Sequence, residues 1–357
     1  MMMSRHIYAV FGVVASAAAI ALASGLSAQG AVSSGWRVVF THHYGAPSNN
    51  SLYTAVAATS THDAWALGVD NWVNAYSGAP VAEHWNGTSW HSATLPAGLT
   101  STVMAASATS ASDVWAVTRF GGDILHFDGT TWSVARHLSG TEELTGVTAF
   151  SASNMWVFGG GGFTTGFGTW HLRGHTWTHV TGDGGGIESA SALSPSDIWA
   201  IGSIKSPEDA IVHYNGTAWQ HMTAPVLSGL GFQQVLAEPG DDVWATATPI
   251  GNGSQWLLLH FSNGQWTSVS LPFRTTGFGY LAPDGQGGFW LESHAGTAPW
   301  VWHRSAAGQW SRVAASPGEM ALVPGTTSLF GASGVAATTG SNAAVWAFGP
   351  IGWTRGG

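Results

Sequence analysis

Two short signatures recur along the chain and constrain its fold more than any other feature. The first reads Ser-x-x-Asp-x-Trp-Ala-apolar, as in "SASDVWAV", and the second reads His-aromatic-Asn/Asp-Gly-x-Ser/Thr-Trp, as in "VHYNGTAW". From Trp36 to Trp353, the tryptophans that end the second signature are on average about 45 residues apart. This spacing is typical of a unit of four antiparallel strands. The sequence therefore predicts seven such units.

Each unit contains four short segments of strand-like composition, separated by Gly, Ser, Asp or Asn. In the second unit these are "STVMAASA", "DVWAVT", "DILHFDG" and "TTWSVAR", which we expect to be strands A to D from the centre outward. Strand A is rich in small residues, which suits the crowded axis of a ring, and Trp on strands B and D fills the wider space outside. We predict an all-β fold, a single seven-bladed β-propeller of four-stranded antiparallel blades spanning residues 36–357.

The way in which the ring closes is less evident from the sequence. Trp36 in "GWRVVF" and Trp353 in "IGWTRGG" both resemble the beginning of a strand D. The first signature weakens toward the C-terminus, where "GQGGFWL" and "GTTSLFG" lack its Asp and Phe330 replaces the seventh Trp. We expect the N-terminal strand to complete the last blade beside a short C-terminal strand.

The signatures carry a family resemblance. "SASDVWAV" followed by "LHFDGTTW", and "SPSDIWAI" followed by "VHYNGTAW", resemble the repeats of secreted bacterial β-propellers in the YVTN, BNR (Asp-box), WD-repeat-like and kelch-like group. The resemblance covers about residues 36–353 and implies a propeller without implying an activity. The Gly-x-Ser/Thr-Trp ending is similar to that of the sialidase Asp-box, but the preceding Asp or Asn lies one residue closer to the Trp.

Residues 1–30 have the composition of a secretory signal peptide. Arg5 and His6 precede the 18-residue apolar run "IYAVFGVVASAAAIALAS", and the small residues of "GLSAQGA" follow it. We expect a bacterial-type signal, a protein that is secreted or associated with the cell envelope, and no membrane insertion after cleavage. The alternative is an uncleaved anchor, because 18 residues approach the length that spans a bilayer. The chain has no Cys, so a lipid anchor on Cys and disulfides are excluded.

The charged residues are few and mostly acidic. They make up 8% of the chain, and 10 Lys plus Arg against 19 Asp plus Glu give a net charge of −9. The basic residues do not cluster, so a phosphate backbone would meet no positive track and nucleic acid is excluded as a partner. We expect a monomer that needs neither a metal nor another cofactor.

The recurring His of the second signature is interpreted as structural. It lies six residues before the terminal Trp in five units and seven before it in the sixth, and Ala347 replaces it in the last. A catalytic or metal-binding His needs a distinct set of partners, whereas one copy per blade is distributed around a ring. We expect each ring to bond a local oxygen, such as that of the signature Asp, and we expect the Asp carboxylates to accept backbone N–H groups in turns.

The other face of the predicted propeller is the candidate functional surface. The A–B and C–D turns lie on one face and carry the repeated motifs, whereas the D–A and B–C loops lie on the opposite face and vary in length and content. Binding residues concentrate on variable loops held by a rigid scaffold. The candidate ligand-binding residues are Trp72, Tyr76, Arg119, Asp123, Glu142, Asp183, Glu188, Arg274, Glu292 and His294.

Two enzyme classes can be tested against these residues. A site resembling that of sialidases needs three Arg around a carboxylate, and only Arg119 and Arg274 map to the variable face. A copper site resembling that of galactose oxidase needs a Cys, and the chain has none.

We therefore predict an exported, non-catalytic binding or scaffolding propeller with no catalytic residues, recognising a glycan or an extracellular protein through the variable face. The alternative is a carbohydrate-active hydrolase or lyase that uses loop carboxylates at the axial mouth, since such chemistry needs only a suitably spaced pair.

Overall fold

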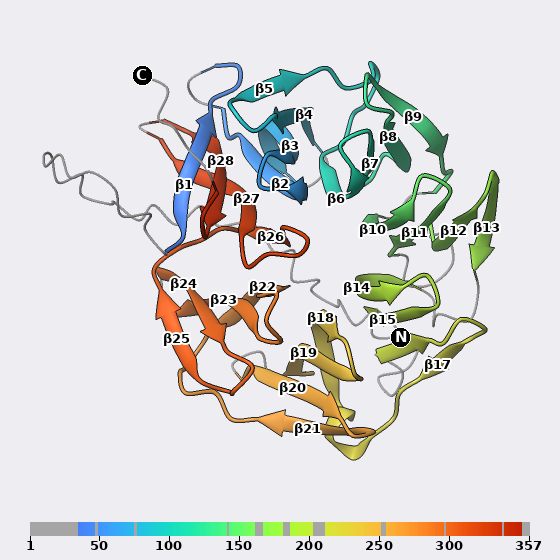
Figure 1. The fold of residues 1–357 in the computed structure, drawn as a ribbon, viewed down its shortest axis with the longest axis vertical. Coiled ribbons are helices and arrows are strands. Elements are labelled where there is room, and N and C mark those ends of the chain that lie inside the picture. The colour runs from blue at the N-terminus through green and yellow to red at the C-terminus, as the bar shows by residue number, and fades with distance from the viewer. Residues whose placement is uncertain are drawn as a thin grey trace, which may run out of the picture.

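The predicted seven-bladed β-propeller is confirmed. The computed structural model describes residues 35–351, except 47–48, 75–76, 141–142, 161–166, 181–185, 203–210, 251–254, 296–297 and 338. In this part of the chain, 28 strands form seven four-stranded antiparallel sheets. Figure 1 shows the sheets as blades around a common centre, with the first strand of each blade innermost.

Blades 1 to 4 follow the chain, each in the order A to D. Blade 1 is β2 (Leu52–Ser60), β3 (Asp63–Asn74), β4 (Ser77–Trp85) and β5 (Trp90–Ala93). Blade 2 is β6 (Val103–Ser110), β7 (Asp113–Thr118), β8 (Asp123–Phe127) and β9 (Trp132–His137). Blade 3 is β10 (Leu144–Ser151), β11 (Asn154–Gly159), β12 (Thr169–Arg173) and β13 (Thr176–Val180). Blade 4 is β14 (Ile187–Ser194), β15 (Asp197–Gly202), β16 (Ile211–Tyr214) and β17 (Trp219–His221).

Blades 5 and 6 repeat this order, and blade 7 contains the N-terminal strand. Blade 5 is β18 (Leu230–Glu238), β19 (Asp242–Pro249), β20 (Leu257–Ser262) and β21 (Gln265–Val269), preceded by the short 3₁₀ helix η1 (Pro225–Leu227). Blade 6 is β22 (Gly277–Pro283), β23 (Phe289–Ala295), β24 (Ala298–Arg304) and β25 (Trp310–Val313). Blade 7 is β26 (Glu319–Leu322), β27 (Leu329–Ala336), β28 (Ser341–Phe348) and β1 (Arg37–His42).

The C–D turn shows why the second signature contains Asp or Asn followed by Gly. In blade 2, the Asp128 carboxylate accepts the backbone N–H groups of Thr130 and Thr131 at 2.8 and 2.9 Å. Gly129 has a φ of +92°, and a Cβ there would approach the Cβ of Ser112 to 2.7 Å. The turn therefore needs a side-chain acceptor followed by a residue without a side chain.

Tryptophans of adjacent blades fill the seams between the sheets. Trp65 on strand B of blade 1 is 2% exposed, and its ring centroid lies 4.7 Å from that of Phe127 and 5.2 Å from that of Trp132, both in blade 2. Trp156 and Trp199 make the same kind of contact with the blades that follow them. The apolar area of the signature aromatics is therefore buried between blades, which stabilises the ring.

The ring closes through the N-terminal strand, as expected. β1 pairs with β28 from Arg37 opposite Ala347 to His42 opposite Ala343, and forms the outermost strand of blade 7. Trp36 directly precedes β1, so it takes the place of the strand D Trp of blade 7, and it packs edge-on against Trp290 of blade 6 at 5.8 Å. Trp353 lies outside the described residues.

Two segments that the spacing of the signatures assigns to variable B–C loops, residues 69–80 and 292–299, are instead mostly strand. In blade 1, β3 extends to Asn74 and β4 begins at Ser77, and in blade 6, β23 extends to Ala295 and β24 begins at Ala298. The pairing of Val69 and Asp70 with Pro80 and Ala79 continues the ladder beyond the unit's usual length. Among the described residues, none of the helices has the length and apolar character required to cross a membrane.

Candidate functional site

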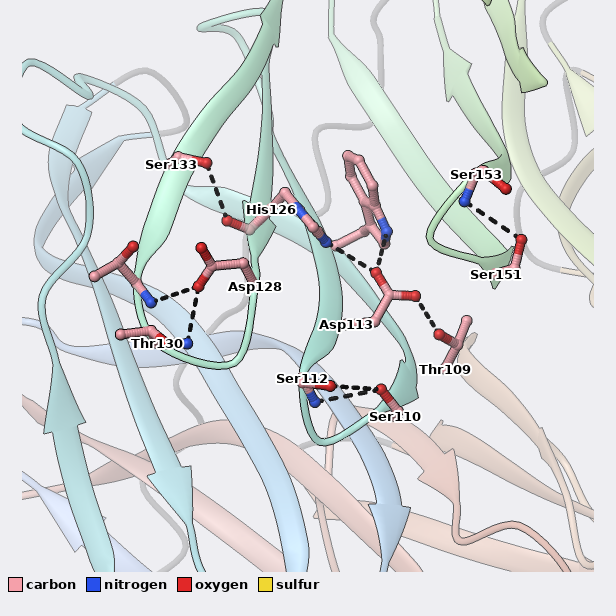
Figure 2. A network of polar contacts seen from close by, with 12 residues as sticks. Thr109, Ser110, Ser112, Asp113, His126, Asp128, Thr130, Ser133, Ser151 and Ser153 are labelled. Atoms are coloured by element: carbon pink, nitrogen blue, oxygen red, sulfur yellow. Dashed lines mark hydrogen bonds and ion pairs between the residues drawn. The ribbon is translucent and has the colours of Figure 1, made fainter. Parts of the chain in front are cut away.

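The repeated His belongs to the scaffold. In six blades its Nε2 lies 2.6 to 3.0 Å from a side-chain oxygen of the turn between strands A and B or the start of strand B, and its ring stacks on the strand B Trp at 3.8 to 4.5 Å. Figure 2 shows this arrangement in blade 2, where His126 bonds Asp113 at 2.9 Å. The pairs are His84 with Asp63, His126 with Asp113, His171 with Asn154, His213 with Asp197, His260 with Asp242 and His303 with Asp284.

The signature Asp acts differently from the expectation. In blades 1 and 2 the carboxylates of Asp63 and Asp113 accept bonds from His and from the hydroxyls of Thr59 and Thr109, rather than serving as acceptors for turn N–H groups. Burial alone would raise the pKa of the Asp63 carboxyl, but the bonds from His84 and Thr59 lower it below its usual value. The Asp is therefore the hydrogen-bond acceptor that positions the His.

Two blades modify this arrangement and one lacks it. In blade 6, whose first signature has no Asp, Asp284 from the A–B turn bonds His303 at 2.8 Å. In blade 3, Asn154 replaces the Asp, and burial together with the charge of Arg173 lowers the pKa of His171 to about 4. In blade 7, Phe330 pairs with Ala347 where the other blades pair Trp with His.

Two surface cavities beside the repeated His residues are not candidate sites. A cavity of about 350 Å³ lies between blades 6 and 7 and is bordered by Asp284, His303 and Phe348. A smaller one of about 220 Å³ between blades 3 and 4 is bordered by His171 and Tyr214. The Asp and His groups that border them already bond one another or a neighbouring side chain. The cavities are gaps in the seams beside structural histidines.

The repeat pattern is broken at the axis in blades 5 to 7. The blades can be aligned through their strand pairing, because in each blade one residue of strand A pairs with the aromatic residue of strand B. The strand A residue two positions before this paired residue is small in blades 1 to 4 and is larger and polar in blades 5 to 7. In blade order these residues are Ala55, Ala105, Gly146, Ser189, Gln234, Tyr280 and Glu319.

Glu292 departs from the repeat at a core position. It lies two residues after the strand B Trp, where the first signature has an apolar residue, and the equivalents in blades 1 and 2 are Leu67 and Val117, both 0% exposed. The Glu292 carboxylate is nevertheless 4% exposed and accepts a 2.8 Å bond from the Ser316 hydroxyl. Burial raises its pKa, although Ser316 and the backbone N–H of Tyr280 partly oppose the shift. A buried carboxyl at a core position lowers stability, so a functional reason is needed.

The carboxyl lies at a bulge in the innermost strand of blade 6, and blades 1 to 5 have a bulge at the same place. The register of β22 shifts between Phe278 and Leu281, so Gly279 and Tyr280 face the single residue Glu292. A Cβ on Gly279 would lie 2.6 Å from Oε2 of Glu292. The glycine therefore makes room for the carboxylate beside the axis.

Tyr280 and Glu319 extend this polar region into blade 7. Burial raises the pKa of the Tyr280 hydroxyl, the charges of Glu319 and Glu292 raise it further, and that of Arg119 opposes them. Burial also raises the pKa of Glu319 well above its usual value, although the Val56 N–H of blade 1 bonds its carboxyl. Arg119 belongs to blade 2, so its charge acts on Tyr280 across the axis of the ring.

A second charged group lies at the ends of the inner strands of blades 2 to 4. Arg119 follows strand β7, and its Nε donates to Glu143 Oε2 at 2.6 Å. Its backbone is fixed between blades, since its N–H bonds the Thr102 carbonyl and its carbonyl accepts the Leu144 N–H. Glu188 is the second residue of β14. Part of its side chain is exposed, but the protein packed around the carboxyl withdraws it from solvent, and this burial together with the charge of Glu143 raises its pKa.

The side chains near the axis are hereafter called the axial cluster, and consist of Arg119, Glu143, Glu188, Tyr280, Glu292 and Glu319. Arg119, Glu143, Glu188 and Glu319 lie at strand ends on the side of the D–A and B–C loops, which is the face predicted to be functional. Arg119, Glu188 and Glu292 are among the candidates from the sequence. The structure adds Glu143, Tyr280 and Glu319.

The remaining candidates do not join this cluster. Asp123 pairs with the exposed His137 at 2.8 Å, and Trp72 lies on β3, where its backbone N–H bonds the Asn50 carbonyl. Arg274 is exposed in the loop between β21 and β22. His294 is half-buried on β23, and burial lowers its pKa. Tyr76, Glu142 and Asp183 lie outside the described residues.

A signal for two of the three added residues, Tyr280 and Glu319, was available in the sequence. They occupy positions where blades 1 to 4 have Ala, Gly or Ser, just as Glu292 occupies the apolar position of the first signature. Aligning the units residue by residue would have revealed these substitutions. The alignment needs the register of the two repeats whose signatures are weakest.

Comparison with known proteins identifies the fold and no closer relationship. No protein-family model matches the chain, and no curated protein matches it. Among solved structures, Ycf48 bound to a D1 peptide has a TM-score of 0.60 and 16% identity, over 88% of this chain and 96% of that chain. The WD40 β-propeller domain of Doa1 has a TM-score of 0.59 and 8% identity, over 88% and 97%.

A third similar structure is an enzyme. An inactive virginiamycin B lyase from Staphylococcus aureus, with quinupristin, has a TM-score of 0.58 and 11% identity, over 87% of this chain and 99% of that chain. The structural neighbours are β-propellers. At these identities the likeness shows the fold alone, and propellers of this shape include binding proteins and a lyase.

Proposed function

We propose that the protein is a binding propeller that holds a polypeptide segment of a partner protein at the axial cluster. The observation that supports it is the buried Glu292, an ionisable residue where the equivalent positions of blades 1 to 4 are apolar. The surrounding cluster draws on five blades, and most of it lies at the strand ends that face the variable loops. One neighbour of the same fold, Ycf48, is described with a bound D1 peptide.

A glycan partner is the weaker form of this proposal. Glycan sites usually present aromatic faces, and Trp72, the described aromatic residue among the candidates, lies on the hairpin of blade 1 rather than in the axial cluster.

The assignment to the YVTN, BNR or kelch-like group remains a prediction, as do export through residues 1–30 and a monomeric state. Fractionation of culture medium and N-terminal sequencing of the released protein would test export and the boundary of the mature domain.

The enzyme alternative keeps one supporting observation. The pKa values of Glu188 and Glu292 are both raised, mainly by burial, as is common for general acids. If the protein is a hydrolase or lyase, incubation with polysaccharides will release new reducing ends or unsaturated products, and Glu188→Gln or Glu292→Gln will abolish the release.

Selection from a displayed random-peptide library, run beside a glycan array, tests the main proposal. We expect peptides to be selected, and their binding to weaken by about tenfold or more in Arg119→Gln and Glu188→Gln. Arg312→Gln is the matched control, because it removes the same charge from the outermost strand of blade 6, where the guanidinium stacks 4.3 Å from Trp300. Binding of glycans alone, or peptide binding that is insensitive to both axial variants, would contradict the proposal.

A further inference from the structure

We infer that the axial cluster recognises a cationic side chain, Lys or Arg, in the bound polypeptide, with Glu292 and Glu319 as its acceptors. This inference rests on the proposed function and specifies the chemistry of the partner.

The balance of charges in the cluster favours a cation. It contains four carboxyl groups and one permanent cation, Arg119, which already bonds Glu143 at 2.6 Å. Among the described residues, no ion pair joins Glu188, Glu292 or Glu319 to Lys, Arg or His. With all carboxyls ionised the cluster carries three uncompensated negative charges, and the whole chain has a net charge of −9. A positive group brought by a partner would meet a favourable potential.

One acceptor atom in the cluster has no partner. Oε2 of Glu319 has no accessible surface and makes no hydrogen bond, although the same carboxyl accepts the Val56 N–H. Buried carboxylate oxygens are ordinarily bonded, because an unmade bond leaves the desolvation of the group uncompensated. An ammonium or guanidinium group supplies several N–H donors on one positive charge, which suits such an oxygen better than a neutral donor does.

Seam geometry shows that Glu319 does more than join two blades. At the equivalent place in the seam between blades 4 and 5, the backbone N–H of Val235 on strand A bonds the Ser189 hydroxyl of the preceding blade at 3.3 Å. At the seam between blades 7 and 1 the carboxyl of Glu319 serves Val56 instead. A hydroxyl would suffice for that bond, so the second oxygen and the charge of Glu319 are available for another role.

The elevated pKa values agree with this assignment. Burial raises the pKa of Glu188, Glu292 and Glu319, because the charged form is poorly solvated there. A cation bound among them would favour the charged form, so binding would lower these pKa values and release protons. Proton release is therefore a signature that a neutral ligand would not produce.

Isothermal titration with a matched pair of probes tests the inference. The probes are Nα-acetyl-lysine methylamide and the same molecule acetylated on Nε, which keeps the four-carbon side chain and removes the charge. We expect the lysine probe to bind in the millimolar range, typical of a single side chain, and the acetylated probe to bind at least about tenfold more weakly. The measured heat of lysine binding should change with the ionisation enthalpy of the buffer.

Variants locate the effect in the cluster. Glu292→Leu restores the residue found at this position in blade 1, and Glu319→Gln keeps an acceptor for Val56 without the charge. Each should weaken lysine binding by about tenfold or more and reduce proton release. Glu238→Gln is the control, since Glu238 is the last residue of β18, at the opposite end of the inner strand, and its removal should leave binding unchanged. If Glu292→Leu does not fold, Glu292→Gln replaces it.

The outcomes separate this inference from the proposed function. Equal binding of both probes, or lysine binding that Glu292→Leu and Glu319→Gln leave unchanged, overturns the cation site. Selected peptides that need Arg119 and Glu188 but contain no essential Lys or Arg overturn it as well, while leaving the proposed function intact. Lysine binding at the cluster without any selected polypeptide supports the cation site and overturns the polypeptide function.

Discussion

Carboxyl groups occur in two places in this propeller, the repeated His–Asp sites, here called the rim, and the axial cluster, and their surroundings differ. At the rim, six blades repeat a His that stacks on a Trp and bonds an Asp or Asn. At the axis, Tyr280, Glu292 and Glu319 occupy positions where blades 1 to 4 have small or apolar residues. The rim carboxylates are bonded by His and Thr, and the axial Glu319 keeps an oxygen without a partner.

This difference indicates how to read function in a repeat protein. A polar group that recurs in nearly every unit has the same local partners each time, so it explains stability. A polar group found in one unit, where the others are apolar, has no such explanation, and it lowers stability unless it serves something outside the repeat. The predictions below test whether substitutions at the rim and at the axis have opposite consequences.

The largest effect is expected at a rim Trp. Trp132 is 7% exposed and packs against Trp65 and Phe127 at the seam between blades 1 and 2. Trp132→Ala should lower the free energy of unfolding by about 3 to 5 kcal/mol, because it leaves a cavity between blades. Urea titration followed by circular dichroism measures this. A loss below about 1 kcal/mol would show that the seam collapses around the gap.

The rim His is expected to have an intermediate effect. His126→Ala removes the ring that stacks on Trp115 at 4.1 Å and leaves the buried Asp113 with fewer donors. Unfolding free energy should fall by about 1 to 3 kcal/mol with peptide binding unchanged. His137→Ala is the matched control, because His137 also bonds an Asp but its side chain is 62% exposed, and its loss should be below about 1 kcal/mol. If His126→Ala lost peptide binding while its stability stayed unchanged, the rim His would have a functional role instead of a structural one.

The axial Glu should behave in the opposite way. Glu292→Leu replaces a buried carboxyl with the apolar residue of blade 1 and should raise the free energy of unfolding by about 1 kcal/mol while weakening binding. Thermal unfolding of the variant and the wild type at pH 7 provides the comparison. Destabilisation of Glu292→Leu by a similar amount would show that the carboxyl belongs to the scaffold, like the residues at the rim.

A smaller, pH-dependent effect should distinguish blade 3 from its neighbours. The pKa of His171 is lowered to about 4, mainly by burial, so between about 4 and its ordinary value of 6.5 the unfolded chain binds more protons than the folded one. This contribution to stability is present above pH 6.5 and is lost as the pH falls toward 4. Asn154→Asp restores the acceptor of the other blades and should reduce the loss, measured as the difference in urea midpoint between pH 7 and pH 5. An unchanged difference would show that Asn154 does not control His171.

The smallest effect is expected from Glu238, which lies on the repeat face. Burial and the charges of Asp284 and Asp242 raise its pKa from 4.5 to about 7. Between these values the folded chain binds more protons than the unfolded one, so this contribution to stability declines as the pH rises from 4.5 to 7. Glu238→Gln should flatten that part of the stability curve and raise the urea midpoint at pH 8. A curve parallel to that of the wild type would exclude Glu238 as its source.

The sequence by itself determined the number of blades, the four strands of each and the structural role of the His, and it led to the prediction that function lies on the face of the variable loops. These properties depend on contacts within one unit or between adjacent units, such as the Asp128 turn or the seam at Trp65, and each is repeated often enough to be recognised. Arg119, Glu188 and Glu292 were selected from that face without any indication that they lie near one another.

Only the tertiary structure decided which polar residues meet and in which register the N-terminal strand closes the ring. Arg119, Glu188 and Tyr280 come from blades 2, 4 and 6, and residues so far apart in the sequence approach one another only because seven blades share an axis. The use of Asp284 in place of the missing signature Asp, and the position of Tyr280 opposite Glu292, depend on strand register, which the weak C-terminal repeats do not specify. The pairing of Arg37 with Ala347 and of His42 with Ala343 likewise became known only when the two ends of the fold were placed side by side.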